Sequence, residues 1–368
     1  EGKPPNYTEK QKQLIQSASK ARVKICGLAG SGKTVVLAGR AVNAHKRHGG
    51  RVLILTFNIT LGSYIHDSIS AVREDFPWSA FDISNYHRFI TLALNNADIP
   101  IEVPEHLRYD GTNRDIARKI SLQREQYFED TYYSNTRVFE GVEIDAKYDT
   151  ILIDEIQDYK PEWIKIIRSY FLEENGEMIL FGDEKQNIYK RALDEERRSK
   201  VVEGFGRWEK LTKSFRYAAE SPIIPLVESF QKAFLLENYE VDRDESFQLS
   251  LTNIGIQSYG IFDATEMGKL AKEIISIAKN NNIHPNDISI ISSQEEILRS
   301  LDNVLRNSEL HRERTLCSFP SHEVTKHPKY SESYEKTSRA KKMGFNLNSG
   351  VMKLSSTHSF KGFESPFV

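Results

Sequence analysis

The sequence predicts an α/β fold of two doubly wound parallel sheets with short, mainly helical insertions. Three observations support this prediction. Strand-like apolar segments alternate with helical segments in both halves of the chain. A glycine-rich loop, Gly27 to Thr34, stands between the first strand and its helix, and a later apolar strand ends in Asp154 and Glu155. Strands that alternate with helices form parallel sheets, and ligands bind at the carboxyl ends of such strands.

The first half of the chain supplies these elements in a regular order. Thr8 and Gln11 have the spacing of a capping box at the start of a helix. The strands that follow are apolar, and the helices carry apolar residues at helical spacing. In chain order we expect strand 22–26, helix 35–48, strand 51–56, helix 58–71, strand 80–84, strand 148–154 and strand 178–181.

The second half repeats the alternation. In chain order we expect strand 258–262, helix 265–279, strand 288–292, helix 294–306 and strand 351–355. Residues 95–145 lose strand signals and gain charged and aromatic side chains, which indicates an inserted helical subdomain. Residues 308–349 are polar and low in aliphatic side chains, as expected for an insertion or a flexible excursion. The expected domains are therefore a first of residues 1–94 and 146–215, and a second of residues 216–307 and 350–368.

The composition limits location and partners. The net charge is −2 at pH 7, so a nucleic-acid contact would be a local surface. The two cysteines, Cys26 and Cys317, are too few for a disulfide framework and are typical of a reducing compartment. No apolar run reaches membrane-spanning length, and nothing at the start resembles a signal peptide. We expect a cytoplasmic monomer, and a piece of a longer protein, because the chain begins without methionine and stops directly after a motif.

The glycine-rich loop fits G-x-x-x-x-G-K-[ST], the pattern of a phosphate-binding loop. Glycines let backbone N–H groups point at phosphate oxygens, and the following helix adds the positive end of its dipole. Lys33 is expected to reach the β- and γ-phosphates, and Thr34 to ligate Mg²⁺. The plainer alternative is a turn with an exposed lysine. The residues expected to hold the nucleotide are Gly27, Ala29, Gly30, Ser31, Gly32, Lys33 and Thr34.

The strand that ends in Asp154 and Glu155 has the Walker B arrangement. Asp154 is expected to hold Mg²⁺, and Glu155 to orient or deprotonate the attacking water. A strand that ends in two acids is also common at a surface turn. The phosphate-binding loop upstream favours the catalytic interpretation.

Asp154 to Asp158 resembles the D-E-x-Q-D box of UvrD/Rep-like superfamily 1 helicases, and other segments match that family in order. They are Gln11, Thr56-Phe57-Asn58, Tyr86-His87-Arg88-Phe89, Gly182 to Tyr189, Leu211 to Arg216, and Ser356 to Glu364. The resemblance covers nearly the whole chain. It implies two RecA-like domains, with ATP in the cleft between them and a single strand of nucleic acid across their tops.

The resemblance also implies further residues at the ATP site. Gln11 corresponds to the glutamine that reads adenine, and Glu364 to a glutamate on the nucleotide sugar. Gln186 corresponds to the glutamine that senses the γ-phosphate, and Arg216 to the arginine that reaches this phosphate across the cleft. Three of these residues have a plainer alternative. Gln11 could only cap a helix, Gln186 could be a turn amide, and Arg216 could be a solvated charge.

Contacts with nucleic acid are implied for residues in four of the matching segments. They are Thr56, Phe57, Asn58, Tyr86, His87, Tyr189, Thr357 and His358. The two histidines rest on the resemblance alone, since a lone histidine in a polar loop is more often a surface group.

Three features depart from the family. The aromatic residue that usually follows the tyrosine of the Gly182 to Tyr189 segment is replaced here by Lys190-Arg191-Ala192. A stacking contact contributes about 1–3 kcal/mol per base, so its loss predicts a weaker grip on the strand or less unwinding. The two insertions are short, which predicts a reduced strand-separating part. The family's last motif, with another γ-phosphate arginine, is absent because the chain ends at Val368, so we expect this fragment to bind ATP and hydrolyse it poorly or not at all.

Together these observations predict an ATP-dependent translocase or helicase on single-stranded nucleic acid, of the kind used in DNA repair. DNA is favoured over RNA by the resemblance alone. One alternative is a non-unwinding ATPase switch of a repair or defence system, which responds to nucleic acid or to a protein partner or module outside this fragment. The other is a P-loop enzyme of small-molecule metabolism, such as a kinase, which gives no account of the later motifs.

Overall fold

Two parallel sheets organise the part of the chain that the structure describes, and each belongs to a separate unit. The structure is a computed structural model. It describes residues 5–16, 20–27, 30–109, 113–144, 147–182, 204–212, 260–263, 265–307, 312–321, 331–363 and 365–368. The first unit comprises Glu1–Phe57, Ile65–Pro100 and Asp130–Tyr259, and the second comprises Asn58–Tyr64, Ile101–Glu129 and Gly260–Val368.

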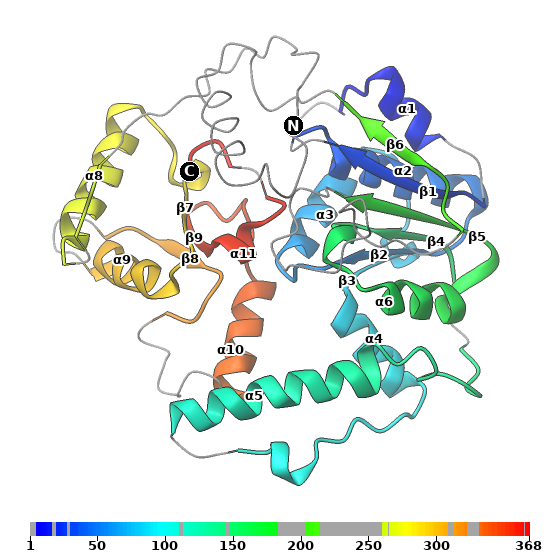
Figure 1. Ribbon diagram of the computed structural model, residues 1–368. Coiled ribbons are helices and arrows are strands. Elements are labelled where there is room, and N and C mark those ends of the chain that lie inside the picture. The colour runs from blue at the N-terminus through cyan, green and yellow to red at the C-terminus, as the bar shows by residue number, and fades with distance from the viewer. Residues whose placement is uncertain are drawn as a thin grey trace. The chain divides into compact units, whose positions relative to one another are not determined.

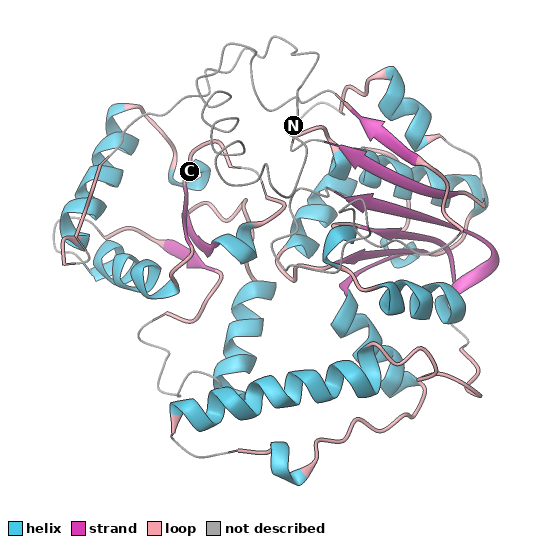
Figure 2. Cartoon of the chain, viewed as in Figure 1, coloured by secondary structure: helices cyan, strands magenta, loops and turns pink. Residues whose placement is uncertain are grey.

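The sheet of the first unit has six strands in the order β3-β2-β4-β5-β1-β6, and every neighbouring pair is parallel. The strands fan across this unit in Figures 1 and 2. They are β1 (Arg22–Gly27), β2 (Val52–Thr56), β3 (Phe81–Asn85), β4 (Tyr148–Ile153), β5 (Leu172–Gly182) and β6 (Trp208–Leu211). β2 is buried along its whole length, as expected for a central strand covered on both faces. The predicted α/β class is confirmed.

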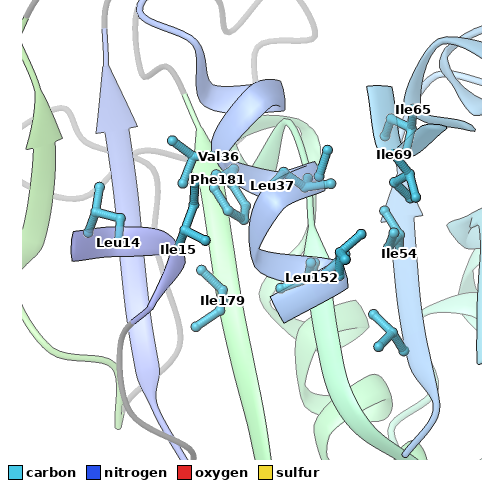
Figure 3. Close-up of a cluster of buried hydrophobic side chains, with 14 of the residues drawn as sticks. Leu14, Ile15, Val36, Leu37, Ile54, Ile65, Ile69, Leu152, Ile179 and Phe181 are labelled. Atoms are coloured by element: carbon cyan, nitrogen blue, oxygen red, sulfur yellow. The ribbon is translucent and has the colours of Figure 1, made fainter. Parts of the chain in front are cut away.

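Helices pack on the first sheet through one continuous apolar core. Ile54, Leu152 and Ile179 contribute one side chain each from β2, β4 and β5, and helices supply Leu14, Val36 and Ile65 among others. Figure 3 shows these side chains meeting between the helices and the strands. The helices of this unit are α1 (Glu9–Ile15), α2 (Lys33–His48), α4 (Tyr86–Asn96) and α6 (Pro161–Ile166), and α3 (Leu61–Ser70) begins in the second unit's segment.

A buried ion pair lies within the first unit. Arg40 of α2 and Glu177 of β5 are each 1% exposed, and their Nη2 and Oε2 atoms are 2.5 Å apart. Arg40 also donates a hydrogen bond to the carbonyl oxygen of Leu14 at the end of α1. Glu177 accepts further bonds from Arg47 and Thr150. The pair therefore ties α1, α2 and two strands together.

The second unit has a three-stranded parallel sheet in the order β7-β9-β8. Helices α8 and α9 pack on it through Ile275, Leu301 and Leu354, among other residues. Arg124 of α5 pairs with Glu335 of α10 at 2.8 Å. The elements of this unit are α5 (Arg114–Phe128), α8 (Met267–Asn280), β7 (Ser289–Ser292), α9 (Glu295–Asn307), β8 (Thr315–Cys317), α10 (Glu332–Met343), β9 (Met352–Ser356) and α11 (Thr357–Phe360).

Short helical turns complete the described secondary structure. They are the 3-10 helices Trp78–Ala80, Glu105–Leu107, Ile156–Asp158 and Pro285–Asp287 and the π-helical turns Glu129–Tyr133 and Ile167–Phe171.

Two segments differ from the sequence expectation. Residues 260–263 have no regular structure where a strand was expected over 258–262, and residues 258–259 lie outside the described part. Ile261 is 87% exposed, so its apolar side chain does not pack in a sheet. Within 308–349, where we expected an insertion, β8 pairs with β9 and α10 forms a helix of 12 residues. The domain boundaries themselves stay a prediction.

Candidate nucleotide site

The phosphate-binding loop joins the end of β1 to the start of α2. Gly30 and Gly32 have φ angles of 78° and 81°, in the left-handed region that favours glycine. Gly32 is the N-cap of α2 and provides no side-chain cap, so the first-turn N–H groups have no capping side chain. The Lys33 Nζ atom donates a hydrogen bond to the Gly27 carbonyl oxygen at 2.8 Å. The lysine therefore lies across the loop, where a phosphate would be a stronger, charged acceptor.

The loop fits a phosphate group for two further reasons. The Ser31 hydroxyl is buried and has no hydrogen-bond partner among the described residues. A Cβ atom at Gly27 would lie 2.4 Å from that hydroxyl oxygen and 2.9 Å from the Leu211 carbonyl oxygen, so only glycine fits there. A buried hydroxyl without a partner costs free energy, and a phosphate oxygen is a suitable acceptor for it.

Gln11 reaches this loop from α1. The predicted capping box is present, because Thr8 accepts from the Gln11 N–H and Gln11 Oε1 accepts from the Thr8 N–H. The same Gln11 amide donates from Nε2 to the Ser31 carbonyl oxygen at 3.3 Å. Gln11 therefore caps α1 and also contacts the phosphate-binding loop. Its contact with adenine stays a prediction.

The acidic strand end lies at the same edge of the sheet as the loop. In the register of the sheet, Cys26 pairs with Gly182 and Ile153 pairs with Leu180. Because β5 separates β1 from β4, the two strand ends are two strand spacings apart, about 10 Å. This is the edge at which parallel α/β sheets bind ligands.

The two acids are buried, and their backbone is held in a definite conformation. Asp154 donates its N–H to the Leu55 carbonyl oxygen at 2.9 Å, and its Oδ1 accepts from the Glu155 N–H at 3.0 Å. Glu155 has φ 54° and ψ 48°, a left-handed conformation that costs about 1–3 kcal/mol for a residue other than glycine. The Gln157 amide donates to Glu155 Oε2. Such strain is found where the surrounding structure fixes a functional side chain.

Tyr159 follows these acids and was not predicted from the sequence. It is buried, and its hydroxyl has no hydrogen-bond partner among the described residues. Burial, together with the charges of Asp154 and Asp158, raises the pKa of Tyr159 well above its usual value. The hydroxyl therefore stays protonated and remains a hydrogen-bond donor.

Aromatic rings gather where β2, β3 and β4 end, and Trp163 of α6 lies at their centre. We call this the strand-end cluster, which consists of Phe57, Tyr86, His87, Tyr133, Tyr159 and Trp163. Trp163 stacks on Tyr86 at 4.5 Å and on Phe57 at 6.2 Å between ring centroids. Its indole N–H donates to the Ser134 hydroxyl at 3.0 Å. Only Phe57, Tyr86 and His87 of this cluster were expected at the site from the sequence.

Two of the expected nucleic-acid contacts, Thr56 and Tyr86, are buried in this structure. Thr56 is 1% exposed, and Tyr86 is fully buried with its hydroxyl donated to the Tyr133 carbonyl oxygen at 2.7 Å. Neither side chain exposes surface that a strand of nucleic acid could contact in this structure, and Tyr86 packs on Trp163, Tyr159 and His87. Phe57 and His87 are half-buried, and their rings contact each other at 6.5 Å between centroids.

The remaining expected contacts lie in the second unit. The Asn58 amide donates to the carbonyl oxygens of His358 and Ser359, both at 3.0 Å. The Asn58 side-chain amide is therefore already hydrogen-bonded to the backbone of the same unit. Thr357 and His358 are exposed at the start of α11.

Five predicted residues lie outside the described part of the chain. They are Ala29, Gln186, Tyr189, Arg216 and Glu364. Within the described part, no group of three or more His, Cys, Asp or Glu side chains could hold a metal ion. Thr34 and Asp154 carry oxygen donors of the kind that Mg²⁺ prefers, and it commonly binds through one carboxylate together with substrate phosphates. None of the helices described here is long and apolar enough to cross a membrane.

Comparison with known proteins places the loop and the acids in one segment. Residues 11–192 match the family model described as an AAA domain. The crystal structure of T4 UvsW is similar, with a TM-score of 0.29 and 11% sequence identity over 93% of this chain and 56% of that chain. This chain thus spans just over half of that protein's length. No curated protein matches the chain. The segment 11–192, which contains the phosphate-binding loop and the acidic strand end, is therefore similar to this family and has a P-loop NTPase fold.

Proposed function

We propose that this chain is an ATP-dependent translocase or helicase on single-stranded nucleic acid, with DNA as the favoured strand. One observation carries the proposal. The phosphate-binding loop and the buried Asp154–Glu155 pair both follow strands of one parallel sheet, at the same edge of that sheet. The half-buried aromatic side chains Phe57 and His87 follow the neighbouring strands β2 and β3. ATP hydrolysis would close two RecA-like units on each other and move the chain along the strand.

The ATP-handling roles follow from side-chain chemistry. Lys33 and the loop N–H groups hold the phosphates, and the Ser31 hydroxyl donates to one of their oxygens. Thr34 and Asp154 hold Mg²⁺, which when bound supplies charge stabilisation to the phosphates. Glu155 orients or deprotonates water, and its backbone strain and its bond from Gln157 fix its carboxylate. Gln186, Arg216 and Glu364 remain predictions by resemblance.

Phe57 and His87 are the proposed contacts with the strand in the first unit, and Thr357 and His358 those in the second. Backbone contacts and ring stacking do not read base edges, so no sequence preference is expected.

A second function, an ATPase switch that does not unwind, is favoured by one sequence observation. Lys190-Arg191-Ala192 replaces the stacking aromatic that follows the tyrosine of the family motif. In this version a polynucleotide or a protein partner triggers hydrolysis without directional movement. A translocation assay on the full-length protein separates a switch from a motor.

The test is ATP turnover with and without single-stranded DNA or RNA, by this chain and by a version extended past Val368. Glu155→Gln should bind a fluorescent ATP analogue normally and lose at least 100-fold in turnover. Glu162→Gln changes a nearby exposed acid in the same way and should retain turnover, which makes it the matched control.

The outcomes separate the hypotheses. Turnover by the extended chain that a polynucleotide stimulates supports the proposal. An extended chain that ignores every polynucleotide rules out the motor, and normal turnover by Glu155→Gln rules out the assigned catalytic carboxylate.

A further inference from the structure

Trp163 occupies an unusual position for a core residue. It is 1% exposed, and it contacts residues that follow three different strands of the first sheet. Phe57 follows β2, Tyr86 and His87 follow β3, and Tyr159 follows β4. The indole ring lies nearly parallel to Phe57 and Tyr86, with interplanar angles of 12° and 11°. It meets His87 edge-on at 4.9 Å and Tyr159 edge-on at 5.7 Å.

The residues around this ring come from two proposed sites. Phe57 and His87 are the half-buried side chains proposed to contact nucleic acid. Tyr159 follows Asp154, Glu155 and the 3-10 helix, and its buried hydroxyl has no hydrogen-bond partner among the described residues. Protein interiors are packed like crystals, so a shift of Phe57 or His87 must be accommodated by the tryptophan and passed to its other neighbours.

Tyr159 also contacts Phe57 directly, at 6.3 Å between ring centroids. Rings in contact therefore lead from the strand-binding side chains to Tyr159, which stands five residues after Asp154 and feels its charge. Coupling between two sites requires a physical element that both sites bias, and a continuous set of stacked rings can supply it.

We propose that Trp163 is a positioning residue that couples nucleic-acid contact at Phe57 and His87 to the orientation of the Asp154–Glu155 carboxylates. This inference rests on the proposed function. The Tyr159 hydroxyl, which has no hydrogen-bond partner among the described residues, is the group that gains one: an oxygen of the loaded site. Because coupling free energies are reciprocal, bound nucleotide must alter strand affinity as much as the strand alters nucleotide affinity.

A purely structural role for Trp163 makes a different prediction. A buried ring that only fills space would lower stability when shortened and leave the coupling intact. Phe139 provides the comparison, because it is fully buried in the same unit and packs on Tyr170 and Phe171, away from the strand-end cluster.

The experiment compares Trp163→Leu, Trp163→Phe and Phe139→Leu in the full-length protein. For each, we would measure ATP-analogue affinity, turnover with and without single-stranded DNA, and DNA affinity with and without the analogue. Trp163→Leu should keep analogue affinity within threefold, while stimulation by DNA and the effect of the analogue on DNA affinity both fall at least tenfold. Trp163→Phe retains a stacked ring and should recover most of the coupling, and Phe139→Leu should keep all of it.

A second measurement does not depend on a destabilised variant. The chain has three tryptophans, so Trp78→Phe and Trp208→Phe together leave Trp163 as the single emitting indole. DNA and the ATP analogue should each shift its emission, and the second ligand should change the response to the first.

The inference is overturned if Trp163→Leu is stimulated like the wild type, if Phe139→Leu loses as much stimulation, or if neither ligand changes Trp163 emission. A wild-type protein that responds to no polynucleotide would instead remove the proposed function, and the inference with it.

Discussion

Removal of the Glu177 charge should strongly destabilise the first unit. Glu177 and Arg40 are each 1% exposed, and the glutamate also accepts hydrogen bonds from Arg47 and Thr150. Burial lowers the pKa of Arg40, and the charge of Glu177 opposes this shift. The charge of Glu177 therefore offsets part of the cost of burying the guanidinium.

The expected magnitude follows from this burial. Glu177→Gln leaves a buried guanidinium without its counter-charge, which typically costs about 3–5 kcal/mol. With a urea m-value of about 2–3 kcal/mol/M for a unit of this size, the midpoint should fall by about 1–2.5 M. The double variant Arg40→Met with Glu177→Leu removes both charges together, and it should lose much less than the single change.

Urea unfolding followed by tryptophan fluorescence is a suitable assay, because all three tryptophans, Trp78, Trp163 and Trp208, belong to the first unit. The control is Glu74→Gln, which removes the partner of Lys46 on the same helix, an ion pair about half exposed on both sides. An exposed pair of this kind contributes about 0–1 kcal/mol. A midpoint shift for Glu177→Gln no larger than that for Glu74→Gln would refute the reasoning.

Two further predictions concern the loop and the second unit. Gly32→Ala places a Cβ 2.6 Å from Gln11 Nε2 at φ 81°, so affinity for a fluorescent ATP analogue should fall at least tenfold. Gly49→Ala is the control, because it bears similar backbone strain at φ 68° in open space and should leave this affinity unchanged. Equal losses of affinity in the two variants would contradict the role of the Gln11 contact. Burial raises the pKa of the Cys317 thiol to about 12, so little of it is the reactive thiolate at pH 8. Iodoacetamide at pH 8 should therefore label the half-buried Cys26 before Cys317, and peptide mass spectrometry measures the two labelling rates. The folded state keeps the Cys317 proton to higher pH than the unfolded state does. The contribution of this thiol to the free energy of unfolding is therefore complete below the unfolded pKa of about 8.5 and is lost as pH rises towards 12. Urea unfolding followed by circular dichroism at pH 8 and 10.5 can measure the loss. Labelling of Cys317 as fast as Cys26 would show that the thiol is not protected.

The sequence predicts the central strands and the loop because their signals are local. The spacing of Gly27 to Thr34 and the apolar run before Asp154 specify strand, turn and helix within a few residues. β6 and β8 escaped prediction because they have four and three residues, too few to show a period. The apolar residues near Ile261 suggested a strand, but strand formation depends on a partner in a sheet, which local sequence does not supply.

The site was only partly predictable for a related reason. A motif indicates which strand end a residue follows, and it does not indicate which side chains are covered. Tyr86 and Thr56 are buried by tertiary packing, and Trp163 covers Tyr86 from another part of the chain. Tyr159 and Trp163 stand four residues apart after the acidic box, a helical spacing of aromatics that is a weak local signal for the strand-end cluster.

The place of β1 inside the sheet has a consequence for how the chain folds during synthesis. Both of its neighbours arrive late: Arg22 donates to the Gly176 carbonyl oxygen, 154 residues away, and Lys24 pairs with Trp208. At about 5–20 residues per second, the strand that leads into the phosphate-binding loop waits roughly 8–30 s for its first partner. Such non-local pairing is slow and exposes strand edges to other chains. Arg22 and Lys24 alternate with the apolar residues of β1, so the waiting strand carries charges that oppose aggregation until β5 is made.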